Sequence, residues 1–298
     1  MTEKSLLILN RKSGARADLR RLVKSFQKEH DLDVRIPWSK KQMRRDIERA
    51  VENGCRRIIA GGGDGTVNAV VNALLRLDMG GAVSLGLLPL GTANDFARSC
   101  FLPADDLTAA MTYALTAPSQ PTDAGRVNEV WFANVASGGF GAMVTATTPT
   151  DMKARLGGLA YTLHGLSRLS DFEAQSCRLT MDGGAAREIP LAFMAIGNGR
   201  FAGGGFGVTP EAMLDDGALD LAVISHDWQG APGFLLRELI EPGSAEAEAL
   251  VYRTFEHGVI ETERDFHLNL DGEPMVAQRF DISVLPSALN VVRAVREP

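Results

Sequence analysis

The sequence predicts two domains, a parallel α/β domain followed by a largely antiparallel β domain. In the first 125 residues, short apolar runs alternate with stretches whose apolar residues recur at helical spacing. After that point, short segments with strand-like alternation dominate. The chain has 298 residues, 45% of them hydrophobic, which is enough to bury a core in each domain. We therefore expect domains at residues 1–125 and 126–298.

The first domain has the pattern of a parallel sheet. Three apolar runs are typical of buried strands: residues 5–10, 56–60 and 82–90. A further strand is expected at 33–38, between the first two. Between them, residues 16–29 and 40–52 carry apolar side chains at helix-like intervals, and a further helix is expected from about Asp95. Strands that alternate with helices in this way are typical of a parallel α/β layer.

The second domain begins after a break at residues 116–127, which are rich in Pro, Ser, Thr and Gly. Beyond it, six segments alternate like strands: 129–137, 177–183, 189–199, 218–225, 264–272 and 279–286. Helical interruptions are expected at about 150–170 and 230–252. Many strands with few helices favour an antiparallel domain.

Composition and charge exclude several classes of protein. The net charge of −6 gives no general attraction to nucleic acid or to an anionic membrane, so we expect no nucleic-acid partner. The three cysteines, Cys55, Cys100 and Cys177, are widely spaced, which indicates reduced thiols and no disulfide framework. No signal-peptide pattern and no apolar stretch near the ~18 residues of a membrane span is found. A cytoplasmic protein is therefore expected.

Basic residues gather in two segments, 16–24 and 40–49, at helical spacing, and we interpret both as solvated helix faces. Any membrane contact is expected to be transient and peripheral, at the inner face. It would use an apolar cleft rim and local basic residues such as Arg16, Arg20, Arg21 and Lys24.

A glycine-rich segment, GGGDG at 61–65, follows the third predicted strand. A strand ending at Ala60 and a helix starting near Val67 would place backbone N–H groups and a positive helix end at the carboxyl edge of the sheet, where they favour a phosphate. The GxGxxG pattern fails because Thr66 stands at its last position, and no GKS or GKT completes a P-loop. Asp64 would repel a phosphate unless a metal ion or acid/base chemistry is involved. The alternative is a structural turn capped by Asp64.

Two more loops follow predicted strands of the first domain. Residues 87–99 form a strand, a Pro-Leu-Gly turn and a helix start, with Thr92, Asn94 or Asp95 as capping candidates. The segment at 10–14 has polar groups suited to phosphate oxygens, although a plain turn is the alternative: Asn10, Lys12, Ser13 and Gly14. Loops of this kind on neighbouring strands can enclose one nucleotide.

Three motifs carry a resemblance: GGGDGTVN at 61–68, LPLGTANDFA at 88–97 and LNLDGEP at 268–274. In order and spacing they resemble the diacylglycerol kinase catalytic-domain family, which includes sphingosine-kinase-like enzymes, and the whole chain is similar to its bacterial lipid kinases. The resemblance implies a nucleotide-binding α/β domain with a three-layer parallel sheet, and a C-terminal β-sandwich that binds the lipid substrate. The active site would lie in the cleft between them. That the extreme C-terminus packs back on the first domain is left open.

The same resemblance implies an activity and a set of site residues. The activity is transfer of the ATP γ-phosphate, with Mg²⁺, to a hydroxyl of a glycerol-type lipid, with phosphatidylglycerol as the suggested phospholipid acceptor. The nucleotide-binding loop of the family matches seven residues: Gly63, Asp64, Gly65, Thr66, Val67, Asn68 and Ala69. Thr92 matches a nucleotide-contacting threonine, and Glu273 matches the general base. A divalent-metal site for Mg²⁺ or Ca²⁺ matches Met213, Asp216 and Ala218, the first and last through backbone carbonyls.

Two positions depart from the family pattern. A threonine that helps to hold the nucleotide is Pro37 here, and the acidic residue that often follows Asn68 is Ala69. We therefore expect the contacts on the adenine side to be weaker or rearranged.

The chemistry implies separate roles for the carboxylates. A lipid hydroxyl is a poor nucleophile at neutral pH, so a carboxylate must take its proton, and Glu273 in its Asp-Gly-Glu-Pro turn is the candidate. An exposed hairpin residue is the alternative for Glu273. Asp64 and Asp95 are expected beside the phosphates and Mg²⁺. Residues 197–210 are either a mobile lip of the lipid cleft or an ordinary hairpin loop.

Two other functions stay open. One is a kinase for a soluble substrate, of the NAD-kinase type, which shares a GGDG turn. The other is a non-catalytic protein that binds nucleotide or lipid, suggested by Pro37 and Ala69.

Overall fold

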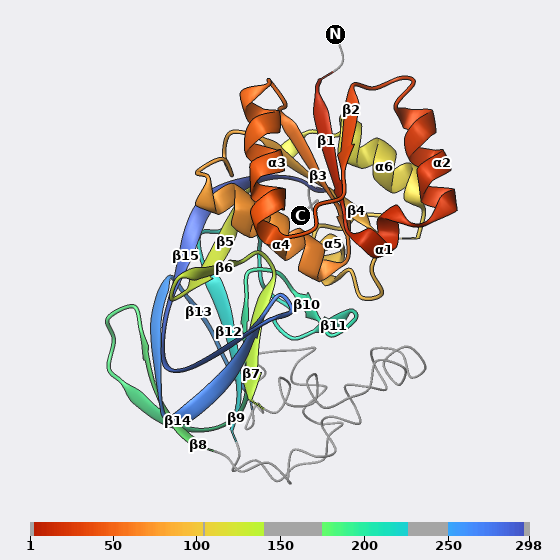
Figure 1. Ribbon diagram of the computed structural model, residues 1–298. Helices are drawn as coiled ribbons and strands as arrows, with labels where there is room; N and C mark the ends of the chain where they lie inside the picture. Colours follow the sequence, from red (N-terminus) through yellow and green to blue (C-terminus); the bar gives the residue numbers. More distant parts are fainter. Residues whose placement is uncertain (1–2, 104, 140–174, 226–249, 295–298) are drawn as a thin grey trace. The chain divides into compact units, whose positions relative to one another are not determined.

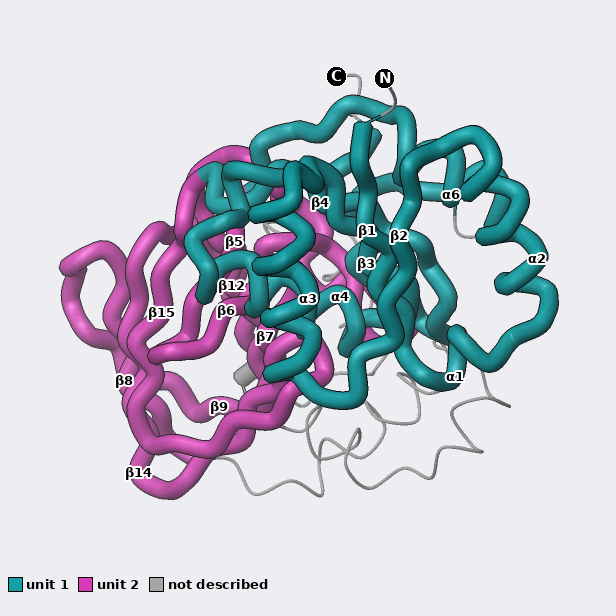
Figure 2. Tube along the Cα trace, turned by 45° about the horizontal axis from the view of Figure 1, so that its top comes forward, with its two compact units in different colours: residues 1–122, 287–298 teal, residues 123–286 magenta. Residues whose placement is uncertain are grey.

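The computed structural model describes residues 3–103, 105–139, 175–225 and 250–294 (Figure 1). The chain divides into two compact units (Figure 2). Unit 1 contains residues 1–122 and 287–298, and unit 2 contains residues 123–286. The predicted fold class is confirmed, because unit 1 is a parallel α/β fold and unit 2 is built from antiparallel strands that form a β-sandwich.

The sheet of unit 1 is parallel. Its strand order is β2 (Leu32–Arg35), β1 (Ser5–Leu9), β3 (Arg57–Gly62) and β4 (Ser84–Pro89). All five residues of β1 and all six of β3 are buried, which explains their continuous apolar runs. The end of the long strand β15 (Glu273–Val292) adds to this sheet, since Asn290 and Val291 pair in parallel with Ser84 and Leu85.

Helices cover both faces of this sheet, which gives unit 1 three layers. The longer helices are α2 (Ala17–Phe26), α3 (Lys40–Glu52), α4 (Asp64–Arg76) and α6 (Leu107–Thr116), and the short ones are α1 (Arg11–Gly14) and α5 (Asp95–Ser99). Leu19 of α2 and Met111 of α6 pack in one cluster with Leu7 and Ile59 of the sheet. Figure 1 shows α3 and α4 on the opposite side of the sheet.

Most of the predicted break at residues 116–127 is a strand and not a linker, although the division between the two units, at residues 122 and 123, falls within it. Helix α6, which the sequence analysis did not identify, ends at Thr116, and β5 (Ser119–Val127) follows directly. Gly125 of β5 is packed under the ring of Phe132, so the glycine fits a close approach within the sheet rather than a linker.

Unit 2 contains the remaining strands, and those with assigned register pair antiparallel. They are β6 (Val130–Phe132), β7 (Val135–Gly139), β8 (Gln175–Met181), β9 (Arg187–Gly197), β12 (Leu219–Ser225), β13 (Leu250–Phe255), β14 (His257–Leu270) and the first part of β15. Strands β9 and β14 each pair with β7 at one end and with β8 at the other. These two long strands therefore flank both β7 and β8, and they contribute to a core that includes Phe132, Phe266 and Phe280.

Two predictions for unit 2 need revision, and a third agrees with one of its two alternatives. Residues 129–137 are not one strand but β6 and β7, separated by Ala133 and Asn134. The helical interruption at 230–252 is wrong for residues 250–252, which belong to β13 and pair with β12; the rest of it, and the one at 150–170, lie outside the described residues. Residues 197–210 contain an ordinary hairpin, β10 (Phe201–Ala202) and β11 (Phe206–Gly207), which turns at glycines with positive φ.

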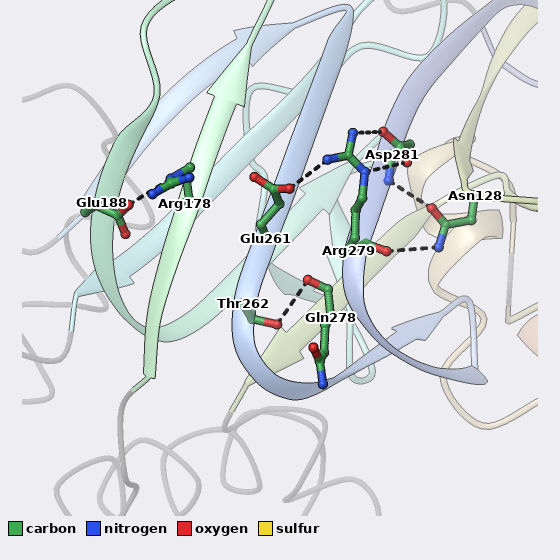
Figure 3. A network of polar contacts seen from close by, with 8 residues as sticks. All are labelled: Asn128, Arg178, Glu188, Glu261, Thr262, Gln278, Arg279 and Asp281. Carbon is green, nitrogen blue, oxygen red and sulfur yellow. Dashed lines mark hydrogen bonds and ion pairs between the residues drawn. The ribbon is translucent and has the colours of Figure 1, made fainter.

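One face of the unit 2 strands carries a row of alternating charges (Figure 3). Arg178 of β8 lies 2.9 Å from Glu188, and Arg279 of β15 lies 2.7 Å from Glu261 and 2.9 Å from Asp281. All of these side chains are exposed. Exposed pairs contribute about 0–1 kcal/mol each, so the row marks a solvent face and supports the strand register.

The three cysteines are free and buried. Burial raises the pKa of Cys100 to about 12 and that of Cys177 to about 11. The reactive thiolate is therefore scarce at neutral pH, and these cysteines serve as small core residues.

Candidate functional site

The glycine-rich segment lies where β3 ends and α4 begins. Strand β3 runs through Gly62, and the carbonyl of Gly63, the N-cap residue, accepts the N–H groups of Thr66 (2.8 Å) and Val67 (3.2 Å). Helix α4 therefore begins at Asp64, and its predicted start near Val67 is wrong. Asp64 lies in the first helical turn rather than in a turn before the helix.

Glycines let two loops of unit 1 approach each other closely. The N–H of Leu90 donates to the carbonyl of Gly62 (2.9 Å), and a Cβ on Gly91 would lie only 2.5 Å from the Cα of Gly63. The cavity left here has a volume of about 10 Å³, about the space of one water. A nucleotide would therefore lie over these loops and not between them.

Gly65 differs from the other glycines of the loop. It is exposed, it has an ordinary helical position in the first turn of α4, and a Cβ there would meet no atom within 4 Å. Within a helix, glycine costs about 0.5–1 kcal/mol relative to alanine. Packing in unit 1 therefore gives no reason for glycine at this position, whereas close approach of a ligand to the helix start does.

Asp64 joins α4 to the next loop. Its Oδ1 accepts the N–H of Phe96 (3.2 Å), in the first turn of α5, and the side chain is half-buried. A carboxylate at the start of a helix is favoured by the positive helix end. The bond also places Asp64 beside the peptide that joins the buried Asp95 to Phe96.

The second loop is held by Asn94. This residue has φ +53°, and its side chain accepts the N–H of Gly91 (2.8 Å) and donates to the carbonyl of Gly91 (3.0 Å). Asn94 precedes α5 as predicted, but its side chain does not cap that helix, because the Asn94 amide is used within its own loop. Thr92 is exposed in this loop.

The first loop contacts the glycine-rich one through Asn10. Residues 11–14 form the one-turn helix α1, and Asn10 caps it by accepting the N–H of Ser13 (2.8 Å). The Asn10 amide also donates to Oγ1 of Thr66 (3.2 Å). The structure thus brings together Asn10 and Thr66, two residues that the sequence assigned to the nucleotide.

The other members of the predicted loop are less accessible. Val67 and Asn68 are buried, and Ala69 is half-buried. The Asn68 side chain bonds that of Asn72 one turn along α4. The accessible part of the loop is therefore Gly63–Thr66.

In unit 2, Glu273 begins β15 at the tip of the hairpin that connects it to β14. Asp271 and Gly272 form the turn with φ of +49° and +94°, and Leu270 pairs with Glu273. Glu273 is half-buried. The predicted sharp turn is present at this position.

Asp271 fixes this hairpin tip and was not identified from the sequence. Its carboxylate accepts the N–H groups of Ala133 (2.7 Å), Asn134 (3.2 Å) and Val135 (2.8 Å), in and after the connection between β6 and β7. The one available signal was Asp-Gly between two strand patterns, which predicts a tight turn but not these three partners.

The predicted metal-site residues lie in the connection before β12. Oδ1 of Asp216 accepts the N–H of Ala218 (3.1 Å), and Oδ2 of Asp123 accepts the N–H of Gly217 (2.7 Å). Burial raises the pKa of Asp216, and the charges of Asp123 and Asp215 raise it further.

Oxygen donors with excess negative charge fit a hard cation. Among the described residues, no three His, Cys, Asp or Glu side chains form a metal cluster. A cation at this position would therefore depend on the backbone carbonyls of Met213 and Ala218.

Two family models match the chain. The model described as the diacylglycerol kinase catalytic domain matches residues 4–127, and the one described as the YegS C-terminal NAD kinase beta sandwich-like domain matches residues 134–293. These matches confirm the family resemblance of the three sequence motifs.

Curated relatives and solved structures agree with these matches. A Cronobacter sakazakii protein named "Probable lipid kinase YegS-like" is 39% identical over 288 residues, 96% of this chain and 94% of the relative. A Chromohalobacter salexigens protein of the same name is 38% identical and covers 95% and 91%. A crystal structure of a diacylglycerol kinase from Bacillus anthracis has a TM-score of 0.78 at 24% identity, covers 98% of both chains and shows the same fold.

Proposed function

We propose that this chain, which belongs to the diacylglycerol kinase catalytic-domain family and to its YegS-type lipid kinases, transfers the γ-phosphate of ATP to a hydroxyl of a glycerol-type lipid. Phosphatidylglycerol is the proposed acceptor.

The observation that carries the proposal is the start of α4. Gly63, Asp64 and Gly65 expose the first-turn backbone of a 13-residue helix, at the carboxyl edge of a parallel sheet. First-turn N–H groups have no partner within the helix and favour an anion. Glycine at position 65, which packing does not require, supports the close approach of a phosphate.

The loops of unit 1 are assigned to the nucleotide. We assign the phosphates to the accessible segment Gly63–Thr66, with Asn10 and Thr92 as additional polar contacts. When Mg²⁺ is bound with ATP it neutralises phosphate charge, and Asp64 and Asp95 are the carboxylates that would hold it. The bond from the Phe96 N–H to Asp64, next to Asp95, supports their joint role.

Glu273 is assigned to the acceptor. As the lipid hydroxyl oxygen bonds to the γ-phosphorus, the bond from phosphorus to the β–γ bridging oxygen breaks, ADP leaves, and the hydroxyl proton passes to the Glu273 carboxylate. The turn that holds Glu273 is fixed by the three bonds of Asp271, which suits a base whose position must be maintained.

Met213, Asp216 and Ala218 are assigned to a second cation, Mg²⁺ or Ca²⁺. The position of Asp216 in the same connection as Asp123 supports this assignment, since a divalent cation is held by carboxylate and backbone carbonyl oxygens.

The acceptor also suggests a location. Among the helices that the structure describes, none is both long enough and apolar enough to cross a bilayer. We place the protein in the cytoplasm, in transient contact with the inner membrane face, where its lipid substrate is presented.

The experiment supplies purified protein with Mg²⁺ and labelled ATP, and offers phosphatidylglycerol, diacylglycerol, other lipids in micelles, NAD, or no acceptor. The proposal expects label in a glycerol-type lipid and most in phosphatidylglycerol. Transfer to NAD but to no lipid would replace it with a kinase of the NAD-kinase type. ATP binding without transfer to any acceptor would indicate a non-catalytic binding protein.

A further inference from the structure

The connection between β2 and α3 exposes two large apolar side chains. Trp38 is 71% exposed and Ile36 is 40% exposed. Tryptophan is enriched at protein interfaces and at membrane–water interfaces, because its ring is apolar and its N–H is polar. These two side chains are therefore candidates for contact with a binding partner.

The loop is held in place by its neighbours. The Arg11 guanidinium lies 4.1 Å from the centre of the Trp38 ring and donates to the backbone carbonyl of Trp38 (3.0 Å). The backbone N–H of Trp38 donates to Oε1 of Gln42 (3.0 Å). Ile36 lies against α1, where a Cβ on Gly14 would be 2.5 Å from its Cδ1. The loop and α1 thus form one continuous surface.

Basic side chains surround the two apolar ones. Arg20 joins the surface because its Nε donates to the carbonyl of Gly14 (2.8 Å). Lys40 and Lys41 follow Trp38 closely and are exposed. We call this set of exposed residues the Trp38 surface: Arg11, Lys12, Arg20, Ile36, Trp38, Lys40 and Lys41.

The charge here is opposite to that of the whole chain. Residues 10–45 contain twelve Lys and Arg against four Asp and Glu, although the chain as a whole has a net charge of −6. Two of these four acids are engaged with arginines, Asp18 with Arg16 (2.6 Å) and Asp33 with Arg35 (4.0 Å). A strongly positive surface therefore lies on an acidic protein.

Helix stability does not explain these charges. Lys40 and Lys41 lie in the first turn of α3, which has no acidic residue, and cations are unfavourable at the positive end of a helix. If residues 40–49 were only a solvated helix face, the lysines in the first turn of α3 would not be explained. Residues that weaken local stability, as these lysines weaken the start of α3, are expected at sites that serve binding.

The Trp38 surface lies at the same edge of the sheet as the nucleotide loops. Strands β1, β2 and β3 are parallel neighbours, so their carboxyl ends share one edge of unit 1. The bond from Asn10 to Thr66 connects α1 with the glycine-rich loop directly.

We propose that the Trp38 surface docks unit 1 on the anionic face of a phospholipid bilayer. Trp38 and Ile36 enter the interfacial layer, where tryptophan is favoured, and the basic residues meet the lipid phosphates. The proposal rests on the proposed function, in which the acceptor is a bilayer lipid. It overlaps the contact expected from the sequence at Arg16, Arg20, Arg21 and Lys24, because Arg20 belongs to both sets. It differs in adding Ile36 and Trp38 and in leaving out Arg16, which is paired with Asp18.

The test is sedimentation of the full-length protein with vesicles of phosphatidylcholine, with and without phosphatidylglycerol. Trp38→Ala and the double variant Lys40→Glu/Lys41→Glu are compared with the wild type. The matched control is Lys28→Glu/Arg56→Glu, with the same change of charge at two exposed residues that precede β2 and β3, at the opposite edge of the sheet. Glutamates at positions 40 and 41 suit the start of α3, so lost binding would not reflect a weakened helix.

The wild type and the control should bind the phosphatidylglycerol vesicles, and binding should fall as salt rises. The Trp38 variant and the Lys40/Lys41 variant should bind about 10-fold or more weakly. Their ATP affinity, and their turnover on a short-chain lipid dispersed as monomers, should stay near the wild-type values.

Equal vesicle binding by all variants would overturn the proposal. So would a loss of ATP affinity in Trp38→Ala with vesicle binding unchanged, which would make Trp38 a nucleotide contact. If the wild type phosphorylates no lipid but vesicle binding still depends on Trp38 and Lys40/Lys41, the docking surface stands and the proposed function fails.

Discussion

Two loops of the molecule gather backbone N–H groups and use them in opposite ways. In unit 2, the N–H groups of residues 133–135 all donate to the carboxylate of Asp271. In unit 1, helix α4 begins at Asp64 after the N-cap Gly63, and the carboxylate nearest to its start, Asp64, accepts the N–H of Phe96 instead.

The difference separates two kinds of site. In the unit 2 loop, the carboxylate of Asp271 already accepts the three N–H groups, and in the proposed function this loop positions the side chain of Glu273. The unit 1 loop has the glycines and the helix start that suit an anion from outside, and in the proposed function it binds the phosphates through its backbone. We expect substitutions in the two loops to fail differently.

The largest effect is expected from Glu273→Gln. Glutamine keeps the shape of the side chain but cannot take the acceptor proton, so turnover should fall by ~10²–10⁴-fold with ATP affinity retained. Initial rates at saturating lipid measure it. Arg279→Gln on the same strand, which loses only exposed ion pairs, is the control and should keep near-normal turnover. Near-normal turnover of Glu273→Gln would remove Glu273 as the base.

Asp271→Ala tests whether the unit 2 loop is held by its internal anion. Three N–H groups lose their acceptor, so we expect the free energy of unfolding to fall by about 3 kcal/mol or more. Turnover should also fall at temperatures where the variant is folded, because Glu273 is no longer fixed, while ATP affinity should persist.

Denaturant unfolding measures the free energy of unfolding of Asp271→Ala, and initial rates measure its turnover. Asp271→Asn retains an acceptor oxygen and should recover part of each loss. A variant that is destabilised but fully active would show that Asp271 does not position Glu273.

Gly91→Ala tests the close approach of the two unit 1 loops. A Cβ at this position would lie 2.5 Å from the Cα of Gly63 and 2.8 Å from Oδ1 of Asn94, so the loops must separate. We expect a loss of stability of about 1–3 kcal/mol together with weaker ATP binding. Urea unfolding and ATP titration measure the two effects, and unchanged values for both would mean that the contact is unimportant.

Asp220 is a carboxyl group of unit 2 whose pKa is set mainly by burial and less by its hydrogen bonds. Burial raises its pKa to about 6, in spite of hydrogen bonds from Tyr252 and Thr254 that favour its charged form. The unfolded pKa is about 4. The stability gained from the protonated form is therefore fully present below about pH 4 and is lost as pH rises through about 6.

Asp220→Asn keeps the uncharged form at every pH. Its stability relative to the wild type should therefore increase by about 2 kcal/mol between pH 4.5 and pH 7.5. Urea unfolding of both proteins at the two pH values measures this. A difference that does not change with pH would mean that Asp220 is already ionised at pH 4.5.

Local pattern was sufficient for much of the fold. Strands β1 and β3 are buried over their whole length, so their apolar runs were visible in the sequence. Strand β5 was missed because Pro121 and Gly125 resemble a linker, and the ring of Phe132 that explains Gly125 comes from the neighbouring strand. Residues 250–252 were expected to be helical, and their pairing with β12 depends on a partner distant in sequence.

In the candidate site, too, features that depend on distant residues were not predicted from the sequence. The glycines at 61–65 were found because they directly follow a predicted strand, and Asn10 was found as a polar residue at the end of another. That Asn10 caps a one-turn helix was not expected. Asp271 was missed because its partners begin 138 residues earlier in the chain. The helix start at Asp64 was misplaced because the carbonyl of Gly63 already accepts the first helical bonds, which residue types alone do not reveal.

The most direct test of the account is a calorimetric titration of ATP, with Mg²⁺ present, into Gly65→Ala and Glu273→Gln. A Cβ on Gly65 would have no atom of the described residues within 4 Å, so Gly65→Ala should fold with equal or slightly higher stability, by about 0.5–1 kcal/mol. The account predicts that Gly65→Ala binds ATP about 10-fold or more weakly, because the Cβ blocks the phosphate, and that Glu273→Gln binds ATP normally. Normal ATP affinity in Gly65→Ala, or lost affinity in Glu273→Gln, would contradict the division of roles between the two loops.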